Sequence, residues 1–238
     1  MLQGLFSAWS SYAGIFSMRT RTPNDVNKWT APEFNRAALV TIDVQRDTLD
    51  GQPFEIAGTS QALPQMAELC AAFRDNALPI VHILRLYLPD GSNAELCRRE
   101  ALRNGEQMFL SGSPGRTIAP ELLPANAAEP DDALLLQNKP QLVGDSEWYV
   151  YKSRWGAFYK SCLEAHLHSL GVSTIILAGC NYPNCIRATV YEASERDFRV
   201  VTIKDGISNF TENGWLELQS VGVNMLTADD CLQQLSNC

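Results

Sequence analysis

The sequence predicts an α/β fold with three α-β-α layers and a mostly parallel, doubly wound central sheet. Short apolar runs rich in β-branched residues alternate with segments whose apolar residues recur every three or four positions. The run Ser173–Ala178 is apolar almost throughout, which is typical of a strand buried on both faces. A chain of 238 residues is long enough for one large domain with a substantial core. Strands that alternate with helices usually form a parallel sheet covered on both sides.

The predicted elements follow one another along the chain with one long interruption. The expected strands are Ala37–Ile42, Pro79–Leu84, Ala133–Leu136, Trp148–Lys152, Ser173–Ala178, Phe198–Ile203 and Val223–Leu226. The expected helices are Ala62–Phe73, one near Asn93–Arg103, Phe158–Leu170, one from Cys185, Trp215–Val221 and a last one ending at Leu235. The interruption, from Leu86 to Asp132, is irregular, and loops of this length in compact domains are usually functional.

The first 30 residues are expected to form an arm outside the main domain, which takes residues 31–238. Apolar residues between Leu2 and Phe16 recur at helical spacing with serines between them, which predicts an amphipathic helix. It lacks the basic start of a secretory signal, and its polar face is serine-rich rather than basic, unlike a membrane-surface helix. We expect it to dock on its own domain or on another subunit.

The composition limits the possible functions. A net charge of −8 argues against a nucleic-acid surface or an anionic membrane as partner, and no apolar run is long enough to span a bilayer. The seven cysteines lack C-x-x-C pairs, which favours reduced thiols and a cytoplasmic location. No Gly-x-Gly-x-x-Gly follows the first strand, which argues against a dinucleotide-binding oxidoreductase.

Three residues whose side chains could take part in catalysis lie at strand ends: Asp43, Lys152 and Cys185. Parallel sheets carry their sites at the carboxyl ends of strands. Cys185 lies where a strand turns into a helix, and the start of a helix stabilises a thiolate. Taken singly, each residue also has an ordinary structural interpretation, as a buried core Cys, a turn Asp and a solvated Lys. Their shared placement favours a joint site.

The sequence resembles the isochorismatase-like cysteine hydrolases, the group that contains N-carbamoylsarcosine amidase and nicotinamidase. The matching segments are Ala38–Asp47, Arg116–Leu122, Tyr151–Phe158 and Gly179–Arg187, in the family's order. Several separated motifs in order are a specific signal. The resemblance extends from about Arg36 to Leu235.

This resemblance implies a catalytic triad of Cys185, Asp43 and Lys152. It also implies a cis peptide bond between Cys180 and Asn181, and an oxyanion hole formed by the backbone N–H groups of Asn181 and Cys185. The usual family turn has Thr where this chain has Tyr182. The function expected is a metal-independent cysteine amidohydrolase that cleaves a C–N bond of a small amide or ureido substrate through a thioester, without a cofactor and as a dimer or tetramer. The alternatives are a hydrolase of small esters, or an inactive member that acts as an interaction protein.

Five further residues near the proposed triad are candidates for binding the substrate: Tyr151, Arg154, Trp155, Tyr182 and Arg187. A guanidinium group binds carboxylate through two parallel hydrogen bonds. We therefore expect Arg187 or Arg154 to bind a substrate carboxylate, with Trp155 and Tyr182 as walls of the site.

No metal ion is expected. The metal-dependent relatives take an Asp and two His ligands from the stretch after the first catalytic loop, where this chain offers only His82, inside a strand. The acids Asp47, Asp50 and Glu55 form a possible site for a hard cation, but Asp50-Gly51 is a turn signal and favours a solvated turn. His82, and the helical His166 and His168, are interpreted as structural.

Overall fold

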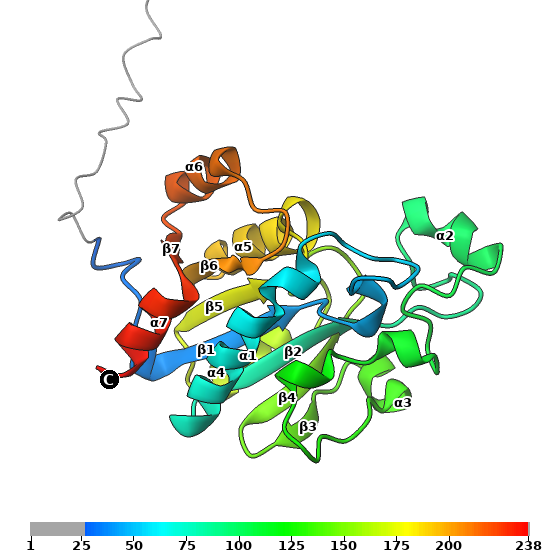
Figure 1. Cartoon of the computed structure of the whole chain (residues 1–238), viewed down its shortest axis with the longest axis horizontal. Coiled ribbons are helices and arrows are strands. Elements are labelled where there is room, and N and C mark those ends of the chain that lie inside the picture. Colours follow the sequence, from blue (N-terminus) through cyan, green and yellow to red (C-terminus); the bar gives the residue numbers. More distant parts are fainter. Residues whose placement is uncertain (1–26, 238) are drawn as a thin grey trace, which may run out of the picture.

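The computed structural model describes residues 27–237, and its centre is a seven-stranded sheet. The strand order is β3-β4-β2-β1-β5-β6-β7, and all neighbours are parallel except β3 and β4 (Figure 1). The strands are β1 (Ala37–Ile42), β2 (Ile80–Arg85), β3 (Gln141–Gly144), β4 (Glu147–Lys152), β5 (Thr174–Gly179), β6 (Arg199–Ile207) and β7 (Asn224–Leu226). The predicted α/β class is confirmed.

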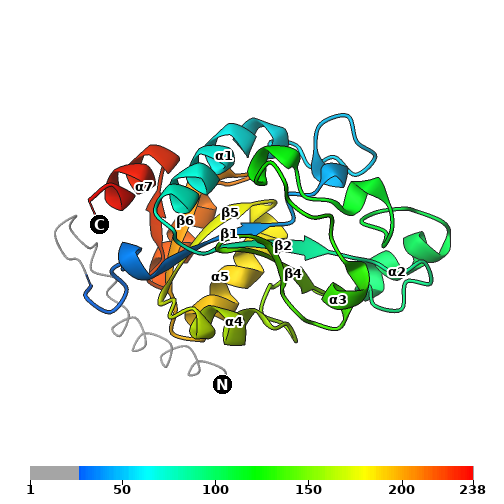
Figure 2. The same ribbon diagram turned by 90° about the horizontal axis from the view of Figure 1, so that it is seen from below.

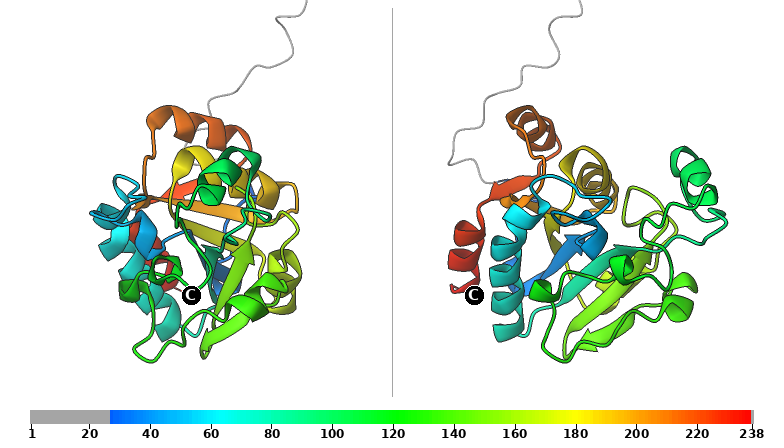
Figure 3. Two further views of the ribbon diagram at one scale, coloured as in Figure 1. Left: turned by 90° about the vertical axis from the view of Figure 1, so that its right-hand side faces the viewer. Right: turned by 45° about the vertical axis from the view of Figure 1, so that its right-hand side comes forward.

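Helices cover both faces of the sheet, which gives three layers (Figure 2). On one face lie α1 (Thr59–Asp75) and α7 (Ala228–Leu235), which run side by side in Figure 3. On the other face lie α4 (Leu163–Ser169) and α5 (Arg187–Ser194), with α6 (Glu212–Ser220) next to α5. Each face has its own core of buried apolar residues, because strands such as β1 and β5 are fully buried and send alternate side chains into the two layers.

The chain reverses direction across the sheet at β1. From β1 it proceeds to β2 and β4 on one side, and then returns to β5 on the other side of β1. The carboxyl ends of β1 and β5 therefore lie at the point where the strand order switches. In open α/β sheets this point is the preferred position for a ligand.

The long segment between β2 and β3 is irregular, as expected. It contains α2 (Leu96–Arg103), which lies beyond the carboxyl end of β2 at the edge of the molecule, and the short α3 (Asp132–Leu136) (Figures 1 and 2). Single turns of other helix types lie along the chain at Phe34–Arg36, Arg46–Thr48, Pro114–Arg116, Pro120–Leu122 and Tyr182–Ile186.

The predicted strand Ala133–Leu136 is wrong: these residues form α3. The Asp131 side chain accepts a hydrogen bond from the Leu134 N–H at 3.0 Å, which caps the helix and outweighs the strand-like run of leucines. The third strand is instead β3, which the sequence did not reveal and which pairs antiparallel with β4. A run of three or four apolar residues does not distinguish a strand from a helix.

The expectations for residues 1–26 lie outside the described part of the chain, including the amphipathic helix Leu2–Phe16. Among the residues that the structure describes, no helix has the length and apolar character needed to cross a lipid bilayer.

Candidate active site

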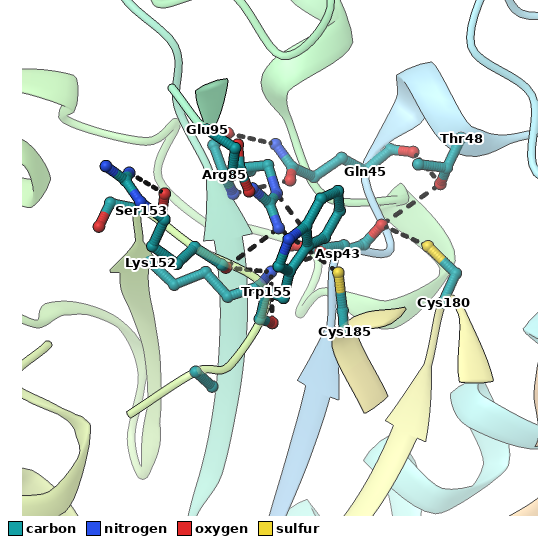
Figure 4. A network of polar contacts seen from close by, with 12 residues as sticks. Asp43, Gln45, Thr48, Arg85, Glu95, Lys152, Ser153, Trp155, Cys180 and Cys185 are labelled. Atoms are coloured by element: carbon teal, nitrogen blue, oxygen red, sulfur yellow. Dashed lines mark hydrogen bonds and ion pairs between the residues drawn. The ribbon is translucent and has the colours of Figure 1, made fainter. Parts of the chain in front are cut away.

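Four neighbouring strands bring charged and nucleophilic side chains to one edge of the sheet (Figure 4). Asp43 follows β1, Arg85 ends β2, Lys152 ends β4, and Cys185 follows the turn after β5. The register places Arg85 opposite Lys152 and Ile42 opposite Gly179, so the four strands end together. The structure thus brings together the three residues predicted from the sequence and adds Arg85 to them.

Lys152 and Asp43 form a buried ion pair. The Lys152 Nζ lies 2.8 Å from Asp43 Oδ2, and the two side chains are 0% and 5% exposed. The same ammonium group donates to the backbone carbonyl oxygens of Arg154 at 3.1 Å and Trp155 at 3.2 Å. All three ammonium hydrogens therefore have acceptors, which fixes the position of the charge beside Asp43.

The Asp43 carboxylate is held in its ionised form. Burial raises its pKa, but the positive charges of Lys152 and Arg85 outweigh burial, and the net pKa is lowered. Its Oδ1 atom is buried and accepts no regular hydrogen bond from the described residues, while the nearby Cys185 thiol contributes to its pKa. The backbone of Asp43 has φ +51°, an uncommon conformation for a residue other than glycine that often marks functional positions.

The Cys185 thiol has its pKa raised, mainly by burial and then by the Asp43 charge, while Lys152 and Arg85 act in the opposite direction. The residue is 5% exposed. This direction differs from the expectation that the start of a helix alone would favour a thiolate. The reason is that burial next to a carboxylate outweighs the helix terminus, so the resting pair is a thiol and a carboxylate.

The turn that carries Cys185 depends on a close approach of β5 to β1. Gly179 has φ +121°, and a Cβ there would lie 2.3 Å from the Ile42 carbonyl oxygen, so no other residue fits without displacement. The Cys180–Asn181 peptide bond is cis, as the resemblance implied. Cys185 lies within a π-helical turn, and α5 begins at Arg187, two residues later than expected.

Arg85 is the residue that the sequence analysis missed. It is 1% exposed, its Nε lies 3.7 Å from Asp43 Oδ2, and its Nη2 donates to Cys185 Sγ at 3.4 Å. The predicted strand stopped at Leu84, one residue short of the observed end. The rule that sites collect at the carboxyl ends of parallel strands would have selected Arg85 had the boundary been right.

A second set of contacts holds the Nη1 end of the Arg85 guanidinium group. Its Nη1 donates to Tyr87 Oη at 2.8 Å and pairs with Glu95, while Tyr87 Oη donates to Glu95 Oε2 at 2.6 Å. Arg98 Nη1 donates to the same Tyr87 oxygen at 2.9 Å. The half-buried Trp155 ring contacts both guanidinium groups, with centroid distances of 5.1 Å to Arg85 and 4.8 Å to Arg98. The long segment from Leu86 to Asp132 was expected to be functional, but no local pattern in it singled out Tyr87, Glu95 or Arg98 as partners of Arg85.

The five predicted substrate-binding residues have different positions. Tyr151 Oη accepts a hydrogen bond from Asn93 Nδ2 at 3.0 Å, and Arg154 Nη1 donates to the carbonyl oxygens of Asn93 and Ser153. Trp155 covers Arg85 (Figure 4).

Tyr182 and Arg187 both contact α6. The buried Tyr182 donates its hydroxyl to the Gly214 carbonyl oxygen at 2.9 Å and packs edge-on against Phe210. Arg187 pairs with Glu217 at 2.8 Å near the surface. Both side chains therefore have structural partners on the C-terminal part of the chain.

The side chains considered as possible metal ligands fit a metal site poorly. Both ring nitrogens of His82 already have partners at 2.7 Å, Thr41 Oγ1 and Glu147 Oε1, deep in the sheet. Glu55 accepts the Gly51 N–H, and Asp47, which is buried rather than solvated, accepts the Phe109 N–H at 2.7 Å. Within residues 27–237, no three His, Cys, Asp or Glu side chains gather in a way that could hold a metal ion. That catalysis needs no metal stays a prediction.

The two helical histidines pack against aromatic rings. His166 meets Trp148 edge-on at 4.8 Å, and burial lowers the pKa of His166. His168 stacks on Phe198 at 5.1 Å. Both lie on α4, where they contribute to packing rather than to the set of residues at the strand ends.

Comparison with known proteins identifies the family of the chain. Residues 37–230 match the family model described as the isochorismatase domain. The chain is 28% identical to maleamate amidohydrolase of Pseudomonas putida over 205 residues, covering 84% of this chain and 87% of that protein. It is 24% identical to a probable inactive nicotinamidase of Arabidopsis thaliana over 212 residues, covering 87% of this chain and all of that protein.

A crystal structure of an isochorismatase family protein from Desulfovibrio vulgaris has the same fold. It superimposes with a TM-score of 0.72 at 27% sequence identity, covering 84% of this chain and 98% of that chain. The family match takes in the segments that carry Asp43, Lys152 and Cys185. The chain therefore belongs to the isochorismatase domain family of hydrolases.

Proposed function

We propose that the protein is a metal-independent cysteine amidohydrolase that cleaves a C–N bond of a small amide or ureido substrate. The observation that carries this proposal is the environment of Asp43. One carboxylate oxygen is bound by Lys152 at 2.8 Å, the other is buried without a regular hydrogen bond, and the Cys185 thiol interacts with this carboxyl group. An ionised carboxylate with a free oxygen next to a thiol is suited to act as a general base.

The reaction follows from these groups. Asp43 takes the proton from Cys185 Sγ, and the thiolate forms a bond with the carbonyl carbon of the substrate. The backbone N–H groups of Asn181 and Cys185 are proposed to stabilise the oxyanion, and each such donor is typically worth about 2.7–4 kcal/mol. The protonated Asp43 then gives its proton to the departing nitrogen as the C–N bond breaks. Water attacks the resulting thioester, and its proton returns through Asp43 to the thiol.

Lys152 stays charged throughout this cycle. It compensates the Asp43 carboxylate before proton transfer and the developing thiolate afterwards. Its three donors are fully engaged, so it positions charge rather than binding the substrate. In this scheme Asp43 moves protons and Lys152 holds Asp43.

The charges around Cys185 favour an anionic substrate. The connected set contains three cations, Lys152, Arg85 and Arg98, but only two carboxylates, Asp43 and Glu95, which leaves one positive charge in excess. A carboxylate on the substrate compensates this excess. Maleamate, the compound named in one relative, is a small amide of this kind.

Arg98 is the cation best able to receive such a carboxylate. Among the described residues its side chain forms no ion pair with an acid, and its contacts are with the Tyr87 hydroxyl and the rings of Tyr87 and Trp155. Arg154 and Arg187 remain alternatives, but a carboxylate would have to replace the backbone acceptors of Arg154 or the Glu217 partner of Arg187. Trp155 is proposed as one wall of the site.

The experiment that tests the function is a hydrolysis screen, read by ammonia release for amides and ureido acids and by acid release for esters. Small amides, ureido acids, nicotinamide and matched esters should be incubated with the protein and with Cys185→Ala. We expect turnover of one amide or ureido acid by the parent protein, and none by Cys185→Ala at an unchanged melting temperature. Preference for an ester would favour the alternative that the protein hydrolyses small esters. No turnover of any compound would favour an inactive member, as in the relative named as probably inactive.

Assembly and location are also proposals. A dimer or tetramer and a cytoplasmic location follow from the resemblance and from the reduced cysteines, and no described contact bears on either. The six cysteines within the described residues are free thiols.

A further inference from the structure

The guanidinium group of Arg85 has a complete set of partners. Its Nη1 hydrogens are taken by Tyr87 Oη and Glu95, and its Nη2 hydrogens by the Arg154 carbonyl oxygen at 3.0 Å and Cys185 Sγ at 3.4 Å. Its Nε faces Asp43 Oδ2 at 3.7 Å. Of the five N–H donors of the arginine, four are hydrogen-bonded and the fifth points at the Asp43 carboxylate, so none is directed to a substrate carboxylate. Burial at 1% exposure also keeps this guanidinium from solvent.

This arrangement differs from that of Lys152. The Lys152 ammonium contacts Asp43 and two carbonyl oxygens, and no hydrogen bond to Cys185 Sγ is formed. Of the two buried cations, Arg85 is the one that donates directly to sulfur. Its far side is fixed by Glu95 and Tyr87, so the donor aimed at sulfur is held in place before any substrate arrives.

We propose that Arg85 is a further catalytic residue whose Nη2–H group stabilises the Cys185 thiolate as its proton passes to Asp43. This inference rests on the proposed cysteine mechanism and extends it. The step moves one proton from Sγ to the Asp43 carboxylate, so Asp43 becomes neutral and the negative charge is transferred to sulfur. Arg85 faces both atoms and therefore keeps a negative partner before and after the transfer.

The need for such a donor follows from the groups around the thiol. Those that face Cys185 are Asp43 after β1, Arg85 on β2, Lys152 on β4 and the buried thiol of Cys180 after β5. Burial and the Asp43 charge raise the pKa of Cys185, and the charges of Lys152 and Arg85 oppose them. A cation within 4–6 Å typically lowers such a pKa by about 1–3 units.

The test is the pH dependence of Cys185 alkylation by iodoacetamide, followed peptide by peptide with mass spectrometry. This readout needs no substrate and separates Cys185 from the exposed Cys97. In Arg85→Gln the apparent pKa of alkylation should rise by about 1–3 units, which corresponds to a rate at least about tenfold lower at a pH below both values. Arg85→Lys keeps the charge but not the planar fork, and its shift should be smaller.

Arg74→Gln is the matched control. Arg74 also pairs with a buried acid, Glu147, through contacts of 2.7 and 2.8 Å, but at the opposite end of the sheet from Cys185. We expect this variant to lower the melting temperature and to leave the alkylation profile unchanged. The profile of Arg85→Lys keeps the proposal testable if Arg85→Gln does not fold.

Two results would overturn the proposal. One is an Arg85→Gln or Arg85→Lys protein that is less stable but alkylates Cys185 with the parental pH profile, since Arg85 would then be structural only. The other is a shift of equal size in Arg74→Gln. A failure of the amidohydrolase proposal is recognised separately, because the substrate screen would then show no turnover of any amide or ureido acid, or equal turnover by Cys185→Ala, whatever the Arg85 variants show.

Discussion

Replacing Lys152 by Met removes the positive half of the buried pair with Asp43. The methionine is similar in length and apolar, so the change deletes the charge and three donated hydrogen bonds with little change in volume. Asp43 keeps only Arg85, at 3.7 Å. The carbonyl oxygens of Arg154 and Trp155 lose the lysine as donor.

The expected cost follows from the burial of both partners. Breaking a buried ion pair by removing one partner typically destabilises a protein by about 3–5 kcal/mol, because the remaining charge is uncompensated. In a domain of this size, 1 kcal/mol corresponds to about 2–4 °C in Tm. We therefore expect Lys152→Met to lower Tm by about 6–20 °C, and kcat/KM to fall by at least about 100-fold.

The measurement is thermal unfolding at neutral pH together with steady-state kinetics. Lys204→Met, which removes an exposed lysine on β6, is the control and should shift Tm by less than about 2 °C. Asp43→Asn should reduce turnover more than Lys152→Met, since Asp43 moves protons. The double variant should be less impaired than the sum of the two, because it leaves no unpaired carboxylate.

The pH dependence gives a second check. The pKa of Asp43 is lowered in the folded protein, so its ion pairs stabilise the fold above the unfolded pKa of about 3.9, and this stabilisation is lost as pH falls through the folded pKa. The stability difference between parent and Lys152→Met should therefore be largest at neutral pH and shrink below about pH 4. A difference independent of pH, or additive losses in the double variant, would refute the ion-pair reasoning.

Four further predictions concern other parts of the molecule. Arg98→Ala should raise KM for an anionic substrate about tenfold or more, whereas the exposed Arg103→Ala on the same helix should not; equal effects would contradict a carboxylate site at Arg98. Exhaustive chelation should leave the rate intact, and activity restored by adding back one ion would disprove a metal-free mechanism. Gly214→Ala should destabilise by about 1–3 kcal/mol despite the better helix propensity of Ala, because its Cβ would lie 2.3 Å from the Tyr182 ring; an unchanged Tm would show that the ring is not held there. Light scattering at micromolar concentration should show a dimer or tetramer, and a monomer with residues Met1–Arg19 present would count against it.

Short sequence patterns were enough to predict much of the fold. Continuous apolar runs located β1, β2, β5 and β6, because a strand covered on both faces carries mostly apolar side chains. They failed at α3, where a capping Asp131 decides between helix and strand. They also failed at β3, which is only partly buried and pairs at the edge of the sheet.

The sequence by itself determined the family, the sheet architecture and the positions of Asp43, Lys152 and Cys185 at strand ends, since each of these is carried by a short contiguous segment. Only the tertiary structure decided which charges surround the thiol. Arg85 contacts Cys185 one hundred residues away, and its partner Glu95 lies in an irregular segment without local pattern. Strand register and burial determine such contacts, because they place side chains from separate strands within a few ångströms in an interior where charges act strongly on one another.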